Sequence, residues 1–499
     1  MKEHDHQIDV SPETFIRLQG EPYQQFVNNG QRKEYVDCSM THAHLVDSTG
    51  YRDNLPLLLS QVGEELKPLT DQGGYYSLDN SLKHGQSLSF EESFSLIAFV
   101  CSALNKPLYN SLSHRINNLG DHQTHLLQAT ALLAAMSAKE SYIGLTAEEI
   151  AGMVAATVHL DTVVRIFSEN SLIAFGGMGG DRGYPLNGDR SKLFSLSTLA
   201  ALALAVDSPV HKHHSYPNTS KVAGQSAIEA YGARSDFFSV AAYKQVLRET
   251  NLIMTSCHDT RSLHTLSHAL KGETINHVIG PLAFTTDARI ALHTMIGVNE
   301  KIHPELITEA LRIIDNRGFQ RYDQSAVYFG TDYKIIDPRI LDPSEYSKDP
   351  QLRTHVMIDE VAPPPYATIA AFLVNGENSG SYVLYPEDFY TLEELKCVNM
   401  DLLRIKNTRE DILAANYDAI TFSDRAKTMY LAMTVGLGLF VKYSLSANEA
   451  LDPKTRRVNR DMLRHYTAVA LSFFVDGAVL KKLEDYVAVT QKYAGGRYI

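Results

Sequence analysis

Residues 173–232 read IAFGGMGGDRGYPLNGDRSKLFSLSTLAALALAVDSPVHKHHSYPNTSKVAGQSAIEAYG, and this stretch decides the fold. It opens on apolar, β-prone residues that lead into Gly176-Gly177-Met178-Gly179-Gly180-Asp181. This density of glycines leaves backbone N–H groups open to an anion, because no Cβ stands in the way. Ser197-Thr198 then begin an Ala/Leu-rich helical run, whose N-terminus offers unpaired N–H groups and a partial positive charge. The pattern predicts a strand–loop–helix unit suited to phosphate.

A second unit of the same kind follows directly. The β-prone Pro209-Val210-His211 leads into Lys212-His213-His214, and Asn218-Thr219-Ser220-Lys221 precedes another helical run. Consecutive units with glycine- or hydroxyl-rich loops are how an α/β domain holds a phosphorylated ligand. The Walker lysine pattern and the Rossmann glycine spacing are both absent, and a glycine cluster by itself also suits tight turns.

The composition describes a chain that is large enough for two domains. It has 499 residues, of which 44% are hydrophobic. The net charge of −12 disfavours nucleic acid or an anionic membrane as the main partner. The polar N-terminus lacks an apolar signal core, and the longest apolar stretches are too short or too interrupted to span a bilayer. We expect a reduced, cytoplasmic protein, because the cysteines are widely separated and lack pairing or zinc spacing: Cys38, Cys101, Cys257 and Cys397.

Two adjacent carboxylates form the strongest candidate site outside this stretch. Asp359-Glu360 follow the short apolar run Val356-Met357-Ile358, which is typical of a buried strand. Carboxylates at the carboxyl end of a strand are well placed to hold Mg²⁺, a hard ion that is usually shared with substrate phosphates. A solvated turn is the alternative for such a pair.

Five blocks of the glycine-rich stretch resemble the anthranilate phosphoribosyltransferase-like family, a glycosyltransferase and nucleoside phosphorylase family with an N-terminal helical domain. The family pattern is a strand, GTGGD, F-N-x-S-T, K-H-G-N-R-x-x-S-S-K and a helix ending in E-A-L-G. This sequence has, in the same order, Gly177-Met178-Gly179-Gly180-Asp181, Phe194-Ser195-Leu196-Ser197-Thr198, Lys212-His213, Thr219-Ser220-Lys221 and Glu229-Ala230-Tyr231-Gly232. Similar runs near residues 280, 387 and 480 extend the resemblance over about residues 85–492.

The resemblance implies an α/β fold, in which a small, mostly N-terminal helical domain precedes a larger domain with a mainly parallel central sheet. Capping-box patterns at Ser89-x-x-Glu92 and Thr146-x-x-Glu149 begin helices of the small domain, which we place at residues 86–165. The larger phosphoribosyl-binding domain then spans residues 166–499. Residues 1–85 are interpreted as an N-terminal extension and 322–352 as an insertion, and a helical segment near 258–275 is expected to pack on the small domain.

The resemblance also implies a Mg²⁺-dependent transfer of 5-phosphoribose from phosphoribosyl pyrophosphate (PRPP), by displacement at C1′ of the ribose, in a homodimer. His213 would act as the weak base for the acceptor amine, and Lys212 would neutralise the leaving pyrophosphate. The implied PRPP-binding residues are Gly177, Gly179, Gly180, Asp181, Ser195, Ser197, Thr198, Lys212, Thr219 and Ser220. The implied Mg²⁺ ligands are Ser197, Asp359 and Glu360.

The acceptor side departs from the anthranilate enzymes. Their G-N-R after Lys-His is replaced by His214-Ser215-Tyr216, and the arginine that binds the anthranilate carboxylate falls near Ser267 and is missing. We therefore expect another aromatic or heterocyclic acceptor, bound by His214, Ser215, Tyr216 and Lys271.

Two alternatives remain open at this point. A nucleoside phosphorylase has no pyrophosphate for metals to hold, so the intact Asp359-Glu360 pair argues against it. A catalytically silent member of the same fold, binding a ligand or nucleic acid, is compatible with the altered loop at residues 214–218, although the acidic net charge argues against nucleic acid.

Overall fold

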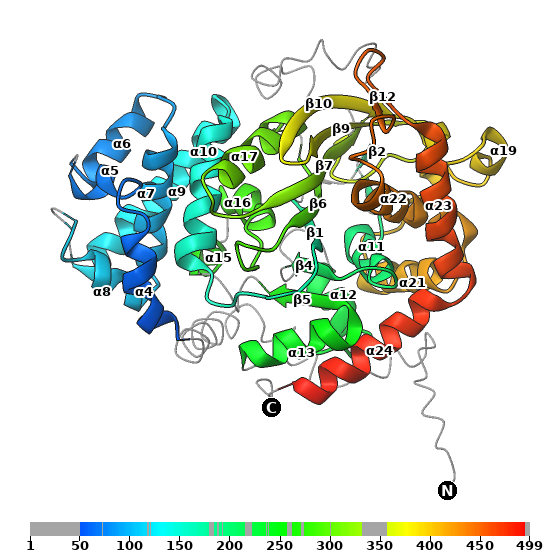
Figure 1. Ribbon diagram of the computed structural model, residues 1–499, viewed down its shortest axis with the longest axis horizontal. Coiled ribbons are helices and arrows are strands. Elements are labelled where there is room, and N and C mark those ends of the chain that lie inside the picture. The colour runs from blue at the N-terminus through cyan, green and yellow to red at the C-terminus, as the bar shows by residue number, and fades with distance from the viewer. Residues whose placement is uncertain are drawn as a thin grey trace, which may run out of the picture.

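The computed structural model describes residues 50–71, 73–116, 119, 121–178, 184–186, 189–191, 193–214, 222–235, 237, 239–256, 262–270, 274–299, 301–331 and 357–494. Helices form one side of the molecule, a sheet crosses its middle, and the C-terminal helices close the other side (Figure 1). None of the described helices is long and apolar enough to cross a membrane.

The first part of the described chain is entirely helical. Its elements are α4 Tyr51–Ser60, α5 Lys67–Thr70, α6 Tyr75–Lys83, α7 Phe90–Ser102, α8 Lys106–Leu112, α9 His122–Tyr142, α10 Ala147–Ala156 and the π-helical turn η1 Thr157–Asp161. Both predicted capping boxes are present, at the N-termini of α7 and α10, so the start of each helix is confirmed.

A mixed, mostly parallel sheet forms the centre of the molecule. Its strands are β1 Leu172–Gly177, β4 Val210–His214, β5 Leu252–Ser256, β6 Leu292–Gly297, β7 Tyr322–Thr331, β8 Met357–Ile358, β9 Ala367–Val374, β10 Glu377–Leu384, β11 Leu451–Asp452 and β12 Arg457–Val458. The order is β11-β12-β10-β9-β7-β6-β1-β4-β5, and β8 pairs with β7. The strands β2 Tyr184–Leu186 and β3 Asp189–Ser191 form a separate antiparallel pair. The predicted α/β fold class, with helices first and a mostly parallel sheet after them, is confirmed.

The order of the parallel strands places a reversal point at β1. The chain moves outward from β1 to β4 and β5, and then crosses to the other side of β1 to form β6 and β7. In open sheets of this kind, ligands bind outside the carboxyl ends of the strands at the reversal point. The carboxyl ends of β1 and β6 are therefore the place where the fold favours a site.

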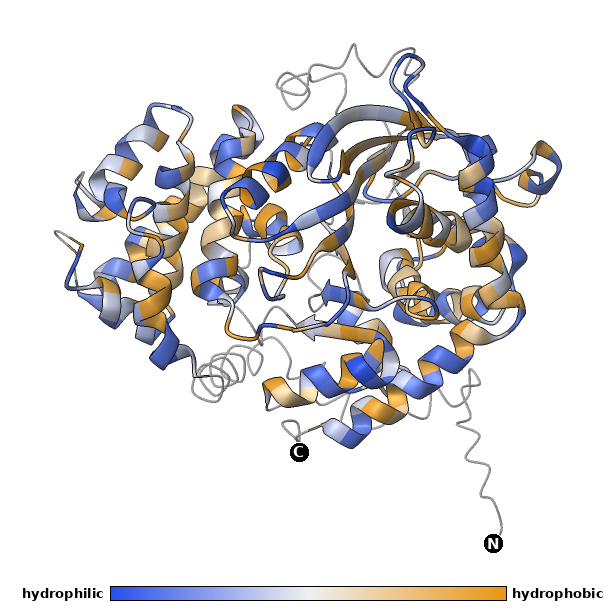
Figure 2. Ribbon diagram, viewed as in Figure 1, coloured by the Kyte–Doolittle hydropathy of each residue, from blue (hydrophilic) through white to orange (hydrophobic). Residues whose placement is uncertain are grey.

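Helices cover the sheet and join its strands. They are α11 Leu196–Leu204, α12 Gly224–Glu229, α13 Val240–Thr250, α15 Ser262–Ala269, α16 Asn276–Leu282, α17 Pro304–Asn316, η4 Pro386–Asp388, α19 Leu392–Leu395, α20 Met400–Leu403, α21 Arg409–Ile420, α22 Arg425–Tyr443, α23 Arg460–Val475 and α24 Ala478–Tyr493. Figure 2 shows that α11 and α22 are predominantly apolar, and every residue from 428 to 441 in α22 is buried. A helix that is apolar all round belongs in the interior.

The structure describes parts of two segments that the sequence set apart from the two domains. Residues 51–83, assigned to an N-terminal extension, form α4 to α6 and contribute Leu59, Leu69 and Leu78 to the common core. The proposed insertion at 322–352 begins at the first residue of β7, a buried strand between β6 and β9. Tyr322 and Tyr328 of this strand pack in the interior. The remainder of that segment from residue 332, like residues 1–49, lies outside the described residues.

Candidate functional site

A segment that carries two carboxylates lies across the carboxyl ends of β1 and β6. Gly177 ends β1, Gly297 ends β6, and the two are direct partners in the parallel register. A Cβ on Gly297 would stand 1.8 Å from the backbone oxygen of Asp359, and a Cβ on Gly177 would stand 3.5 Å from Asp359 Oδ2. Glycine at position 297 is therefore required for this close approach, and the Asp359 carboxylate faces the end of β1.

The residues that follow are held from two other directions. We call residues 358–362 the carboxylate segment. A Cβ on Gly330 of β7 would stand 3.0 Å from the backbone oxygen of Glu360, so β7 also makes room for the segment. In addition, Tyr430 of α22 donates its hydroxyl hydrogen to the backbone oxygen of Val361 at 2.8 Å. The carboxylate pair is thus fixed by contacts with three separate elements.

Lys212 brings a positive charge to the same place. It is buried on β4, and burial lowers its pKa to about 8, although Glu360 and Asp359 oppose the shift by stabilising the ammonium form. Its Nζ donates to the backbone oxygen of His213 at 3.2 Å and lies 5.9 Å from the centre of the Phe175 ring. Two partly buried carboxylates and a buried ammonium group form a charged centre that suits a polyanion bound together with a cation.

The polar side chains of β4 point to two faces of the sheet, as alternation along a strand requires. His211 Nε2 and His213 Nδ1 lie 2.8 and 3.0 Å from Thr255 Oγ1 of β5, so both histidines face the same side. Lys212 and His214 face the opposite side. The two residues predicted to be catalytic, Lys212 and His213, therefore flank β4 from opposite faces.

His214 lies where α11 and α12 begin. A Cβ on Gly224 would stand 2.7 Å from Thr198 Oγ1 and 3.1 Å from His214 Cβ, so these three residues are neighbours. Burial, followed by the charge of Lys212, lowers the pKa of His214 to about 3, so its ring is neutral at pH 7. His214, predicted for the acceptor, is thus placed beside Thr198, which was predicted to bind PRPP.

The start of α11 is anchored by α21. Asn416 Oδ1 accepts the backbone N–H of Ser195 at 2.8 Å, and Asn416 Nδ2 donates to Ser195 Oγ at 3.1 Å. Ser195 therefore directs its N–H and its hydroxyl oxygen into the fold. Ser197 and Thr198 occupy the first turn of α11, where backbone N–H groups lack helical partners.

The other predicted ligand residues lie outside the described part of the chain. They remain predictions: Gly179, Gly180, Asp181, Ser215, Tyr216, Thr219, Ser220 and Lys271. Sequence reasoning also missed Asn416, Tyr430 and Thr255, which hold the site together. No motif marks these three, and each acts across a large sequence separation: 221 residues from Asn416 to Ser195, 69 from Tyr430 to Val361 and 42 from Thr255 to His213.

The donor set fits Mg²⁺. Among the described residues there is no group of three or more His, Cys, Asp or Glu side chains that could hold a metal ion. Asp359 and Glu360 would supply hard oxygen ligands, and Mg²⁺ is ordinarily held by one or two carboxylates together with substrate phosphates. The residues present suit a magnesium ion that arrives with a phosphorylated ligand.

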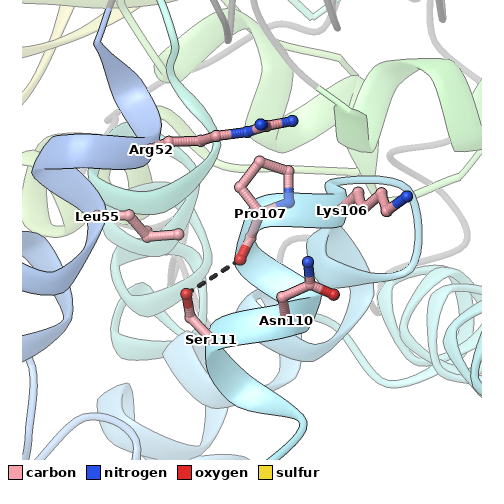
Figure 3. A pocket seen from close by; sticks show the side chains of 6 residues that line it. All are labelled: Arg52, Leu55, Lys106, Pro107, Asn110 and Ser111. Atoms are coloured by element: carbon pink, nitrogen blue, oxygen red, sulfur yellow. Dashed lines mark hydrogen bonds between the residues drawn. The ribbon is translucent and has the colours of Figure 1, made fainter.

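A separate pocket lies between α4 and α8 (Figure 3). Its volume is about 380 Å³, and it is lined by Arg52, Leu55, Lys106, Pro107, Asn110 and Ser111. None of the predicted site residues lines it. We place the candidate site at β1 and β6 because the strand reversal, the carboxylates and Lys212 all coincide there.

Comparison with known proteins finds distant relatives in sequence. No protein-family model matches the chain. The anthranilate phosphoribosyltransferase of Pyrococcus abyssi is 26% identical over 317 residues, which cover 63% of this chain and 75% of that protein. The enzyme of the same name from Deinococcus radiodurans is 26% identical over 251 residues, covering 46% of this chain and 68% of that protein.

Solved structures of the same enzyme share the fold. The anthranilate phosphoribosyltransferase of Thermus thermophilus matches with a TM-score of 0.53 at 18% identity, over 83% of this chain and 99% of that one. The Saccharomyces cerevisiae enzyme in complex with PRPP and Mg matches with a TM-score of 0.54 at 13% identity, over 84% of this chain and 98% of that one. This chain therefore has an anthranilate phosphoribosyltransferase-like fold and is a distant relative of those enzymes in sequence.

Proposed function

We propose that the protein is a Mg²⁺-dependent pentosyltransferase that moves 5-phosphoribose from PRPP to a nitrogen atom of an aromatic or heterocyclic acceptor other than anthranilate. The observation that carries the proposal is the carboxylate pair Asp359-Glu360, held over the ends of β1 and β6 and electrostatically coupled to Lys212. The yeast relative was solved with PRPP and Mg, which supports the same choice of ligand.

The residues that meet at the carboxyl end of β4 have separate roles in the reaction. On one face, Lys212, Thr198 and the amides that begin α11 bind the phosphates, and Asp359 and Glu360 hold the metal with them, assisted by Ser197. Bound Mg²⁺ supplies charge neutralisation to the pyrophosphate. On the other face, His213 is oriented by Thr255 and takes the proton from the acceptor nitrogen.

The bonds that change are few. The bond from C1′ to the pyrophosphate oxygen breaks, and its electron pair leaves with pyrophosphate. The acceptor nitrogen forms the new bond to C1′ and loses one proton to His213. Because the protein forms no covalent intermediate, its contribution is positioning and charge stabilisation. Removing a charge that acts on the leaving group therefore reduces kcat more than it weakens binding.

Neither alternative explains the site equally well. A phosphorylase that uses orthophosphate has no pyrophosphate for a metal-binding carboxylate pair to act on. A protein that only binds a ligand has no need of metal-binding carboxylates at the ends of the strands. Gly297, which allows Asp359 to lie against β6, would then serve no catalytic purpose. We further propose a cytoplasmic homodimer by analogy with the family, and an acceptor that does not depend on a carboxylate-binding arginine, since Ser267 stands in that region of α15.

Release of pyrophosphate tests the proposal. The assay uses PRPP with a panel of aromatic amines and heterocyclic bases, with Mg²⁺ and with EDTA. We expect Mg²⁺-dependent release with at least one acceptor, and a fall of at least about a hundredfold in kcat for Glu360→Gln. Glu377→Gln, on the exposed start of β10, is the matched control and should retain full activity. No pyrophosphate with any acceptor, or full activity of Glu360→Gln, would contradict the proposal.

A further inference from the structure

We propose that Tyr430 is a positioning residue that fixes the carboxylate segment, residues 358–362, relative to the start of the phosphate-binding helix α11. The inference rests on the proposed function, because it concerns how two halves of that site are held relative to each other. One half is the carboxylate segment and the other is the start of α11. Tyr430 touches both halves and contributes no group to the ligands themselves.

The first contact is made by the hydroxyl group. Tyr430 is fully buried, and its O–H donates to the backbone oxygen of Val361, the residue directly after Glu360, at 2.8 Å. A hydrogen bond to the backbone beside a ligand residue restricts the direction in which the ligand side chain points. Partners of this kind typically change metal affinity or activity by 10- to 100-fold when removed.

The second contact is made by the ring. Tyr430 and Phe194 meet edge to face, with ring centroids 6.1 Å apart and an interplanar angle of 88°. Phe194 is buried two positions before the first residue of α11, so this contact sets where the helix begins. Edge-to-face pairs of buried aromatic rings have a defined geometry and a favourable energy beyond simple burial.

The helix that carries Tyr430 is suited to act as a rigid support. Further along α22, a Cβ on Gly438 would stand 2.9 Å from Leu204 Cδ1, near the end of α11, so the two helices pack closely along their length. Asn416 of α21 independently anchors Ser195 at the start of α11. These contacts fix α11 relative to α22 at both ends of α11. The hydrogen bond from the Tyr430 hydroxyl then fixes the carboxylate segment relative to the same helix, α22.

Another tyrosine provides a matched control. Tyr390 is also buried, and its hydroxyl donates to the backbone oxygen of Met429 on the same helix at 2.9 Å. Tyr390→Phe therefore removes the same type of hydrogen bond from the same helix without touching the carboxylate segment. A purely structural role for Tyr430 predicts that the two phenylalanine variants behave alike.

The test compares Tyr430→Phe and Tyr390→Phe by hydrogen–deuterium exchange and by steady-state kinetics. We expect similar losses of Tm in both variants. Amide exchange in the peptide that spans residues 357–366 should become about tenfold faster in Tyr430→Phe only. The kcat of that variant should fall about tenfold, while Tyr390→Phe stays within about twofold of the parent. Equal exchange in both variants, or equal kcat, would overturn the inference.

A second variant tests the same coupling from the other end. Phe194→Leu keeps an apolar side chain and weakens the ring contact, and Phe194 lies two residues before α11. If Tyr430 connects the two halves, exchange at residues 357–366 should also rise in Phe194→Leu, and the combination with Tyr430→Phe should be non-additive. Strict additivity would overturn the inference. Exchange does not require turnover, so a parent protein that releases no pyrophosphate refutes the proposed function while exchange still decides the role of Tyr430.

Discussion

At the scale of single residues, the position of Asp359 at the candidate site depends on Gly297. A Cβ on Gly297 would lie 1.8 Å from the backbone oxygen of Asp359, which no packing adjustment of a side chain can relieve. We predict that Gly297→Ala destabilises the protein by at least about 2–3 kcal/mol, since backbone must move. Urea unfolding measures this change.

The matched substitution lies directly across the sheet. A Cβ on Gly177 would meet only Asp359 Oδ2, at an ordinary contact distance of 3.5 Å. Gly177→Ala should leave the free energy of unfolding within about 0.5–1 kcal/mol of the parent. A Gly297→Ala protein as stable as Gly177→Ala would show that Asp359 does not lie against β6.

The sequence allowed only part of this residue-scale account. It pointed to Asp359, Glu360 and the glycine run by residue type and spacing, and to Lys212 through the resemblance to a family. It did not identify Asn416 or Tyr430, because a buried amide or phenol bonded to a distant backbone group leaves no local pattern. It also did not show that His214 lies beside Thr198, which depends on how α12 follows β4.

At the scale of secondary-structure elements, a buried ion pair ties α9 to α10. Lys139 and Glu149 are 2.9 Å apart and almost fully buried, and Glu149 also accepts the backbone N–H groups of Leu88 and Thr146. Lys139→Met should destabilise the protein by about 3–5 kcal/mol, because an uncompensated charge is left in the interior.

The same substitution at an exposed pair is the control. Lys481 and Asp485 on α24 are 2.8 Å apart with side chains 68% and 45% exposed. Lys481→Met should change stability by no more than about 0.5 kcal/mol. The urea concentrations at the unfolding midpoints of Lys139→Met and Lys481→Met measure the two changes in stability. Equal losses of stability would mean that the α9–α10 ion pair is hydrated in solution.

The packing of α7 on α9 should depend on pH through His125. This histidine stacks on Phe99 at 4.3 Å, and burial lowers its pKa from 6.5 to about 4. Because the folded pKa lies below the unfolded value, the stability contribution is complete above pH 6.5 and is lost as the pH falls toward 4. At pH 5 the loss is about 2 kcal/mol.

A neutral replacement isolates this effect. In His125→Gln the difference in unfolding free energy between pH 7.5 and pH 5 should be smaller than in the parent by about 2 kcal/mol. Urea titrations at the two pH values measure it. An identical pH dependence in parent and variant would show that His125 is protonated within the fold.

At the scale of the whole molecule, the parallel strands β1 and β4 could be predicted, whereas the antiparallel strand β9 could not. The glycine-rich stretch predicts β1, α11 and β4, because the residues that indicate these elements lie close together in the sequence. By contrast, residues 367–374 form an apolar run that periodicity alone does not distinguish from a buried helix, yet they are β9. The segment assigned to an insertion begins with β7, where Tyr322 and Tyr328 are core residues.

The central claim is that the assembled site binds PRPP through a metal held by Asp359 and Glu360. The most direct measurement is isothermal titration calorimetry of PRPP into the full chain, with Mg²⁺ and with EDTA, on the parent and on Glu360→Gln. We expect binding by the parent with Mg²⁺, at least about tenfold weaker binding in EDTA, and little difference between the two conditions in Glu360→Gln. Equal affinity of the parent with and without Mg²⁺, or no binding at all, would contradict the central claim.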